Sequence, residues 1–229
     1  MKIFFVTGNR AEYGLLKRLI KLSVSSDKFE ASLLVTGDHL SNKTNTISEI
    51  NKDGIEIIGK IFCEPKTDSQ LGILNAMGKA LSGYAEFFYK NRPDALVILG
   101  DRYEMLVLAI ASHICKIPLI HISGGEVTHG SLDDNMRHAI TKFSDYHFVA
   151  IEEFKKRVLQ MGESSSRIHV VGGMGIDAIH NIELFNLKQT LEKLNIKNKY
   201  LPIVLCTYHS VTAEEKTLYE CIAMIKALK

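Results

Sequence analysis

The chain has 229 residues, of which 46% are hydrophobic and 24% are charged, as in ordinary globular proteins. Its formal net charge of +2 gives no electrostatic reason to expect a nucleic-acid or membrane partner. No run reaches the roughly 18 apolar residues of a spanning helix, and the apolar part of MKIFFVTGNR is too short for a secretory signal. The four cysteines form no CxxC pair, so we expect reduced, mostly buried thiols in a cytoplasmic protein.

The first half of the chain alternates short apolar runs with segments of helical periodicity. Apolar runs bounded by Gly or Pro are typical of buried parallel strands, and apolar stripes at three- and four-residue spacing are typical of helices. We expect strands at residues 2–7, 29–36, 54–62 and 95–99, and helices at 12–22, 47–53, 71–90 and 104–115.

The alternation continues with strands at residues 119–122, 147–150 and 168–171 and a helix at 152–161. A further helix follows the glycine-rich loop 123–132. This order predicts an α/β fold, a Rossmann-like domain with a doubly wound parallel sheet. The pattern changes after Gly175. We therefore expect one complete domain over residues 1–175, a crossing segment over 176–200, and the beginning of a second domain at 201–229, with a strand at 201–207.

Two loops contain most of the ionisable side chains that could take part in chemistry. GDRYE follows the strand at 95–99, and HISGGEVTHGSLDDNMRH follows the strand at 119–122. Ligands of open α/β sheets bind outside the carboxyl ends of the strands, where both loops begin. The candidates there are Asp101, Arg102, Glu104, His121, Glu126, Asp133, Asp134, Arg137 and His138.

Several of these residues also have plain structural interpretations. Asp101 can cap the helix that follows it, and Asp133 or Asp134 can cap the next one. We favour Glu104 as a residue that complements a helix dipole, while Glu126 can be a surface carboxylate.

The first loop, Gly8-Asn9-Arg10, lies between a strand and a helix amino terminus, which suits an anion. A tight turn with a solvated Arg10 is the alternative. The spacing of His121, Glu126 and His129 fits no zinc pattern, so we expect no metal. No GxSxG, Walker or GxGxxG motif is present, and we expect no cofactor.

Taken together, TGNRAEYG, TGDHLS, GDRYEM, HISGGEVTHGSLDDNMRHAITK and TYHSVT resemble the hydrolysing UDP-N-acetylglucosamine 2-epimerases of sialic-acid-type pathways. The resemblance covers residues 2 to about 212. It implies the two-domain GT-B-like fold, with a UDP-sugar bound between two Rossmann-like domains. It also implies conversion of UDP-N-acetylglucosamine to UDP and N-acetylmannosamine, by elimination of UDP and then hydration of the 2-acetamidoglucal.

The resemblance also implies roles for individual residues. We expect Asp101, Glu126 and Asp134 to transfer protons, and Arg10 and His209 to act on the leaving group, with His209 counted among the catalytic residues. The residues expected to bind substrate are Gly8, Arg10, Glu12, Arg102, Arg137 and His138.

The second domain of this family is much longer than residues 201–229, so we expect weak or no activity from this chain alone. Family members are commonly dimers or tetramers, which implies a homo-oligomer for the full-length protein. Three alternatives stay open: a 2-epimerase of a UDP- or GDP-linked 2,4-diacetamido sugar, a GT-B glycosyltransferase, and a non-catalytic remnant.

Overall fold

A seven-stranded, wholly parallel sheet forms the body of the protein, in the order β3-β2-β1-β4-β5-β6-β7. The structure, a computed structural model, describes residues 1–41, 46–67, 69–196, 203–208 and 217–228. The chain begins at the centre with β1, builds outward through β2 and β3, then crosses back to β4 and builds outward in the other direction. This is the doubly wound topology that the sequence predicts.

The strands are β1 (Lys2–Thr7), β2 (Glu30–Thr36), β3 (Ile57–Ile61), β4 (Ala95–Leu99), β5 (Leu119–Ile122), β6 (Tyr146–Val149) and β7 (Ile168–Val170). The α-helices are α1 (Arg10–Val24), α2 (Ile47–Lys52), α3 (Gln70–Lys90), α4 (Tyr103–Ile114), α5 (Leu132–Phe143), α6 (Glu152–Gln160), α7 (Met174–His180), α8 (Leu187–Lys193) and α9 (Thr217–Ala227). Short 3-10 turns lie at η1 (Gly37–Leu40) and η2 (Ser165–Arg167).

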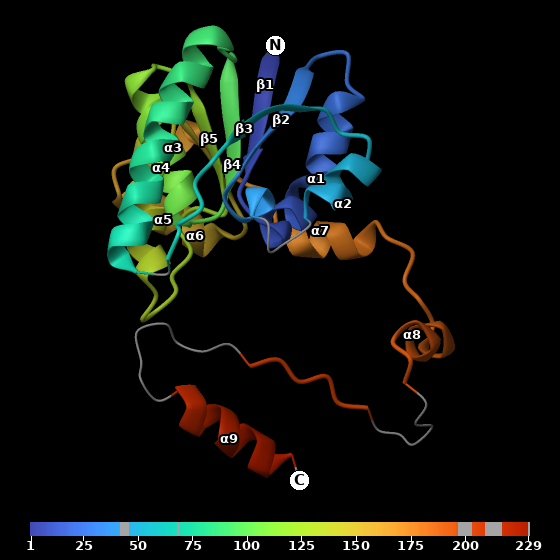
Figure 1. Cartoon of the computed structure of the whole chain (residues 1–229). Coiled ribbons are helices and arrows are strands. Elements are labelled where there is room, and N and C mark those ends of the chain that lie inside the picture. The colour runs from blue at the N-terminus through green and yellow to red at the C-terminus, as the bar shows by residue number, and fades with distance from the viewer. Residues whose placement is uncertain (42–45, 68, 197–202, 209–216, 229) are drawn as a thin grey trace.

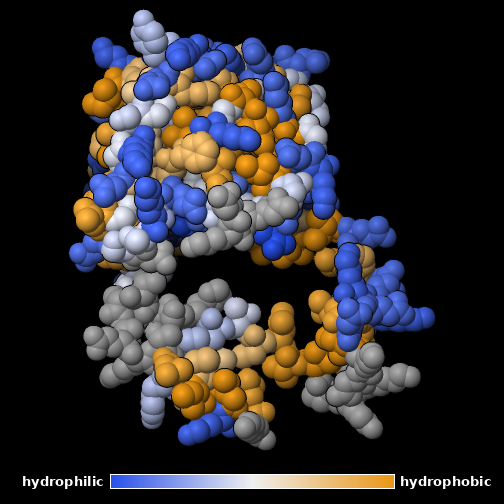
Figure 2. Space-filling view, in the orientation of Figure 1, coloured by the Kyte–Doolittle hydropathy of each residue, from blue (hydrophilic) through white to orange (hydrophobic). Residues whose placement is uncertain are grey.

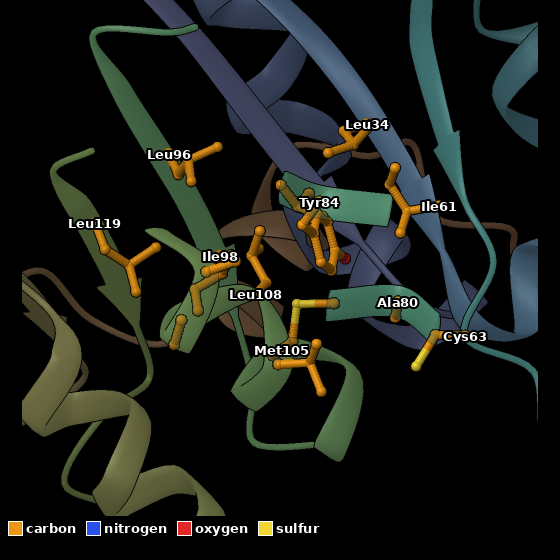
Figure 3. Packing of buried hydrophobic residues seen from close by; sticks show 14 of the residues in the cluster. Leu34, Ile61, Cys63, Ala80, Tyr84, Leu96, Ile98, Met105, Leu108 and Leu119 are labelled. Atoms are coloured by element: carbon orange, nitrogen blue, oxygen red, sulfur yellow. The ribbon is translucent and has the colours of Figure 1, made fainter. Parts of the chain in front are cut away.

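Helices cover the two faces of the sheet and bury its apolar side chains (Figure 1). On one face α3, α4 and α5 pack over β1 and β4, and α1 and α2 pack on the other face. Successive strand side chains point to opposite faces, so β4 supplies Leu96 and Ile98 to the first core and Val97 and Leu99 to the second. Figure 3 shows Ile98 and Leu96 beside Tyr84 of α3 and Leu108 of α4.

The face that carries α1 is less completely covered toward β6. An apolar hollow of about 390 Å³ lies there, and Val97, Ile120 and Phe148 of three neighbouring strands line it. The helix α7 borders this hollow through Met174 and is tied to α1 by an Arg18–Asp177 ion pair of 3.2 Å. Gly172 and Gly173, before α7, thus lead the chain from the edge strand β7 back toward the central strands.

The part beyond α7 differs from the body. Residues 203–208 form no strand, which corrects the strand expected at 201–207; residues 201 and 202 lie outside the described part. Apolar side chains such as Leu205 and Leu218 are exposed there, and Figure 2 shows hydrophobic side chains along this segment. No helix in the described ranges is long and apolar enough to cross a membrane.

The cysteines are less buried than the sequence suggested. Cys63 is buried in the core beside α3, Cys115 and Cys221 are half-buried, and Cys206 is exposed. The expectation of mostly buried thiols is therefore wrong for the segment beyond α7. All four are free thiols, as expected.

The core position Ile98 provides a test of the packing. Ile98→Ala should lower the free energy of unfolding by about 2–5 kcal/mol, because the removed methyl groups leave a cavity in a close-packed layer. The same change at Ile114, which is 75% exposed at the end of α4, should cost less than about 0.5 kcal/mol. Urea denaturation of both variants measures the difference, and equal losses would contradict the assigned core.

Candidate active site

A cavity of about 510 Å³ opens at the carboxyl edge of the sheet, where the loops after β1, β4 and β5 meet. A second cavity of about 540 Å³ adjoins it, and the two share Asn9, Ala11 and Arg102. The residues that line the first cavity come from five separate stretches of sequence: Asn9, Ala11, Glu12, Leu15, Leu99, Gly100, Asp101, Arg102, Ser123, Glu126, Arg137, Gly173, Met174 and Gly175.

Arg137 of α5 is the centre of the polar network in this cavity. Its side chain is only 6% exposed, and its guanidinium makes ion pairs with Asp101 and with Asp134, the latter at 3.1 Å. It also donates to the Glu126 carbonyl at 3.0 Å and to the Thr128 hydroxyl at 3.1 Å. One arginine thus joins the loop after β4, the loop after β5 and the first turn of α5.

The capping expected of these aspartates does not occur. Ser131 caps α5, since its hydroxyl accepts the backbone N–H of Asp133 at 3.2 Å. Asp134 instead accepts the Thr128 N–H at 2.7 Å and lies 3.7 Å from His138 Nε2. Asp101 turns toward Arg137, and α4 begins without a side-chain cap. Both carboxylates are therefore directed toward Arg137 and not toward a helix amino terminus, and Asp101 lines the cavity.

Arg102 is the centre of a second network of charged side chains, next to that of Arg137. It donates to Glu104 at 3.2 and 3.0 Å and to Asp38 of η1 at 3.1 Å. The predicted helix-dipole role of Glu104 is incomplete, because its side chain is almost fully buried and pairs with Arg102. Burial raises the pKa of Glu104, and Arg102 opposes that shift. Sequence reasoning named Glu104 as a candidate but favoured the dipole role, and its pairing with Arg102 was not predicted.

Glu12 lies below the first loop. It is buried and accepts the Gly8 N–H at 2.7 Å and the Asn9 amide at 2.8 Å. Burial raises the pKa of Glu12 to about 7, with Glu104 adding to the shift and the Gly8 N–H and Arg102 opposing it. Glu12 borders the cavity, where its carboxylate holds the first loop, and its role in substrate binding stays a prediction.

The other two residues of the first loop have different roles: Asn9 caps α1, and Arg10 lines the second cavity. Asn9 caps α1 by accepting the Glu12 N–H at 2.9 Å. The Gly8 N–H is occupied by Glu12, so it is not available to the anion that the sequence suggested. Arg10 is largely exposed and pairs with Glu49 at 3.2 Å on the rim of the second cavity, apart from Arg137.

The loop after β5 is held in a sharply bent conformation. Ser123 has φ of +66°, in the left-handed region that side chains other than glycine rarely adopt. The buried ring of His121 lies against Gly124 of this loop. Its Nε2 is 2.9 Å from the Gly100 carbonyl, and its Nδ1 is 3.2 Å from the Thr141 hydroxyl. Burial lowers the pKa of His121 to about 4, so it is neutral at pH 7. The same bend places Glu126 at the cavity, where partial burial raises its pKa.

The cavity therefore brings together Asp101, Glu126 and Arg137, with Asp134 bound to the same arginine. Arg102 and Glu12 line the same cavity. Gly8 and His138 are not among its lining residues: the Gly8 N–H bonds to Glu12, and His138 lies beside Asp134. His209 lies outside the described residues. In the described ranges no three His, Cys, Asp or Glu side chains are grouped as metal ligands.

A doubly wound parallel sheet with acidic and guanidinium groups at its carboxyl edge has these groups where open α/β proteins bind their ligands. The family model of UDP-N-acetylglucosamine 2-epimerase matches residues 22–229. The chain belongs to the UDP-N-acetylglucosamine 2-epimerase family.

Curated relatives agree with this assignment. The Escherichia coli polysialic acid biosynthesis protein P7 is 42% identical over 192 residues, covering 83% of this chain and 49% of that protein. The Legionella pneumophila UDP-N,N'-diacetylbacillosamine 2-epimerase (hydrolyzing) is 39% identical over 217 residues, covering 93% and 56%. The chain thus spans about half the length of the curated relatives it matches.

A solved structure shows the same fold. The Neisseria meningitidis UDP-GlcNAc 2-epimerase, crystallised with UDP-GlcNAc, superposes with a TM-score of 0.69 at 21% identity, over 86% of this chain and 51% of that one. The predicted α/β, GT-B-like fold class is confirmed.

The raised pKa of Glu12 predicts a pH-dependent stability. Between the ordinary pKa of 4.5 and the folded value of about 7, folded protein keeps a proton that unfolded protein has released, so Glu12 makes stability fall as pH rises. Glu12→Gln removes this dependence. The free energy of unfolding of the variant relative to wild type should rise by roughly 3 kcal/mol between pH 4.5 and pH 7.5. Urea titrations at several pH values measure it, and a constant difference would show that Glu12 is not protonated near neutrality.

Proposed function

We propose that the protein is a hydrolysing 2-epimerase that converts UDP-N-acetylglucosamine and water to UDP and N-acetylmannosamine. The observation that carries the proposal is the pairing of Arg137 with both Asp101 and Asp134 beside a cavity that Glu126 also lines. Three carboxylates around one guanidinium are held in separate environments, so they can differ in protonation and divide acid and base roles.

The proposed reaction has two steps. In the first, a carboxylate removes the C2 proton while the C1–O bond breaks, and the electron pair of the C–H bond forms the C1=C2 double bond as UDP leaves. In the second, water adds to C1 and a proton adds to C2 on the face opposite to the one that lost it. Each step needs a proton donor or acceptor on a defined face of the sugar, which general acid–base groups supply.

We assign the proton transfers to Asp101, Glu126 and Asp134. Glu126 is the candidate proton donor, because its burial favours the protonated form, and Arg137 holds the other two carboxylates in place. Arg102 and Arg10 lie at the junction with the second cavity and are the candidate cations for the departing diphosphate, with His209 a further candidate.

A second candidate substrate is a UDP- or GDP-linked 2,4-diacetamido sugar. The observation in its favour is that the Legionella relative, at 39% identity, and a Campylobacter jejuni relative, at 37% over 229 residues, are named for diacetylbacillosamine nucleotides. The two substrates differ at sugar carbons 4 and 6, which the proposed chemistry at C1 and C2 does not involve. We also propose a cytoplasmic location and a role in sialic-acid-type sugar synthesis.

The test measures UDP release from both sugar nucleotides in D₂O, with the sugar product identified by NMR. The expected product carries deuterium at C2 and the inverted configuration there. The rate of this chain should be low, because it spans about half the length of its relatives. Asp101→Asn should reduce it by a further factor of about 10²–10⁴, whereas Asp27→Asn, in an exposed turn, should leave it unchanged. Release that Asp101→Asn does not affect would contradict the assignment.

A further inference from the structure

Two arginines line the second cavity, and each is paired with a carboxylate that is about half exposed. Arg102 pairs with Asp38 at 3.1 Å, and Arg10 pairs with Glu49 at 3.2 Å. The side chains of Asp38 and Glu49 are 45% and 44% exposed. Ion pairs of such exposure are weak, because water screens both partners. Each arginine can therefore exchange its carboxylate for another anion, in a cavity whose volume is typical of ligand pockets.

Arg102 differs from Arg10 in having a second partner, which is buried. Nε and Nη2 of Arg102 donate to the two carboxylate oxygens of Glu104 at 3.2 and 3.0 Å. The side chain of Glu104 is 1% exposed, so this two-oxygen contact is shielded from water. Within the residues that the structure describes, Arg10 pairs with Glu49 alone. The guanidinium of Arg102 is consequently fixed along one edge, while Nη1 on its other side donates to Asp38.

Gly37 brings Asp38 and Glu104 to the same guanidinium. Its φ of +53° lies in the left-handed region, and an added Cβ would lie 2.8 Å from the Gly8 carbonyl oxygen and 3.0 Å from Glu104 Oε1. Glycine therefore lets η1 approach the buried carboxylate this closely. On the other side of Asp38, the backbone N–H of His39 donates to the Gly8 carbonyl at 3.2 Å. The backbone around Asp38 is held on both sides, so its carboxylate can turn away from the guanidinium by rotation of the side chain alone.

A phosphate group suits the outer position of this arginine. It carries more negative charge than one carboxylate, and a guanidinium binds phosphate oxygens through two parallel N–H groups. Three of the five N–H donors of Arg102 are used by Glu104 and Asp38. When Asp38 turns away, Nη1 and the second N–H of Nη2 can donate together.

We propose that Arg102 is a phosphate-binding arginine with an exchangeable outer partner. Asp38 yields the Nη1 position to a phosphate group of the bound nucleoside diphosphate, and Glu104 holds the guanidinium in place during the exchange. The inference rests on the proposed function for the identity of this ligand, since UDP is the leaving group of that reaction. Asp38 then competes with the ligand, whereas Glu104 is a positioning residue, so their removal should change binding in opposite directions.

The first experiment measures the binding of inorganic pyrophosphate to the purified chain by isothermal titration calorimetry at low salt. Asp38→Asn should lower the dissociation constant about 3- to 10-fold, because the phosphate no longer competes with a carboxylate for Nη1. Glu30→Gln makes an equal change of charge at the exposed start of β2. It is the matched control and should leave the dissociation constant unchanged.

Arg102→Gln separates exchange at the arginine from general repulsion by Asp38. Combined with Asp38→Asn, it should remove most of the gain in affinity, because that gain depends on the arginine. A gain of the same size without the arginine would show that Asp38 acts only as a nearby negative charge, and would contradict the exchange. Unchanged affinity in Asp38→Asn, or no binding of pyrophosphate by wild type and variant, would overturn the proposal.

Glu104→Gln tests the positioning role through the sign of its effect. Loss of a negative charge near an anion site would by itself strengthen the binding of pyrophosphate. A glutamine cannot accept both N–H groups of Arg102, so the guanidinium loses its fixed direction and the dissociation constant should rise about 5-fold or more. In the Arg102→Gln background the same change should have no further effect, whereas damage to the fold would persist there. Unchanged or tighter binding would contradict the role of Glu104.

Arg102→Lys provides the same test if urea denaturation shows that Glu104→Gln does not fold. Lysine keeps the positive charge but has no planar pair of donors for the two oxygens of Glu104. The affinity for pyrophosphate should again fall about 5-fold or more, and wild-type affinity would contradict the proposal.

Binding and turnover are separate measurements, so the two proposals can fail separately. Absence of UDP release from any sugar nucleotide would exclude the proposed reaction and leave the exchange at Arg102 intact. Normal UDP release, together with pyrophosphate binding that neither Asp38→Asn nor Glu104→Gln changes, would overturn this inference alone.

Discussion

The arrangement of the candidate site depends on one buried guanidinium. Arg137 reaches from α5 to two aspartates and two further oxygens, and its side chain is nearly excluded from solvent. A buried charge is tolerated only when it is paired and hydrogen-bonded, so each of these oxygens stabilises the arginine as much as the arginine holds them. Loops that are separate in sequence are fixed together because they share this one cation.

A second group of charged side chains lies next to the Arg137 network, where Glu12 and Glu104 are buried under the loops after β1 and β4. Arg102 pairs with Glu104 and extends to Asp38, while Glu12 satisfies the Gly8 N–H. Two acids near one arginine in a space of low polarity cannot both ionise freely. The loops that border the cavity therefore rest on two carboxyl groups whose pKa is raised by burial, that of Glu12 to about 7.

The sheet could be predicted from the sequence, because its strands are short apolar runs separated by glycine, proline and amphipathic helices. Asp101 and Glu126 could be named as candidates because they lie in loops that follow strand ends, and Asp134 and Arg137 because they lie in the helix that continues the second of these loops. Their mutual contacts could not, because Arg137 meets Asp101 across 36 positions of the chain. Local rules allowed Asp101, and Asp133 or Asp134, to be caps; instead Asp101 and Asp134 pair with Arg137, and Ser131 caps α5.

Ser123 adds a different kind of constraint to the same cavity. Its positive φ would cost glycine little, whereas serine pays an energetic penalty of about 1–2 kcal/mol for it. Glycine would therefore fit the folded backbone better, but it would give the unfolded chain many more conformations at this position. The loop of Glu126 is therefore held in shape against the local preference of Ser123, by the His121 ring beneath Gly124 and by the hydrogen bond from Arg137 to the Glu126 carbonyl. Part of the stability of the domain is thus exchanged for the rigidity of a surface that a ligand must fit.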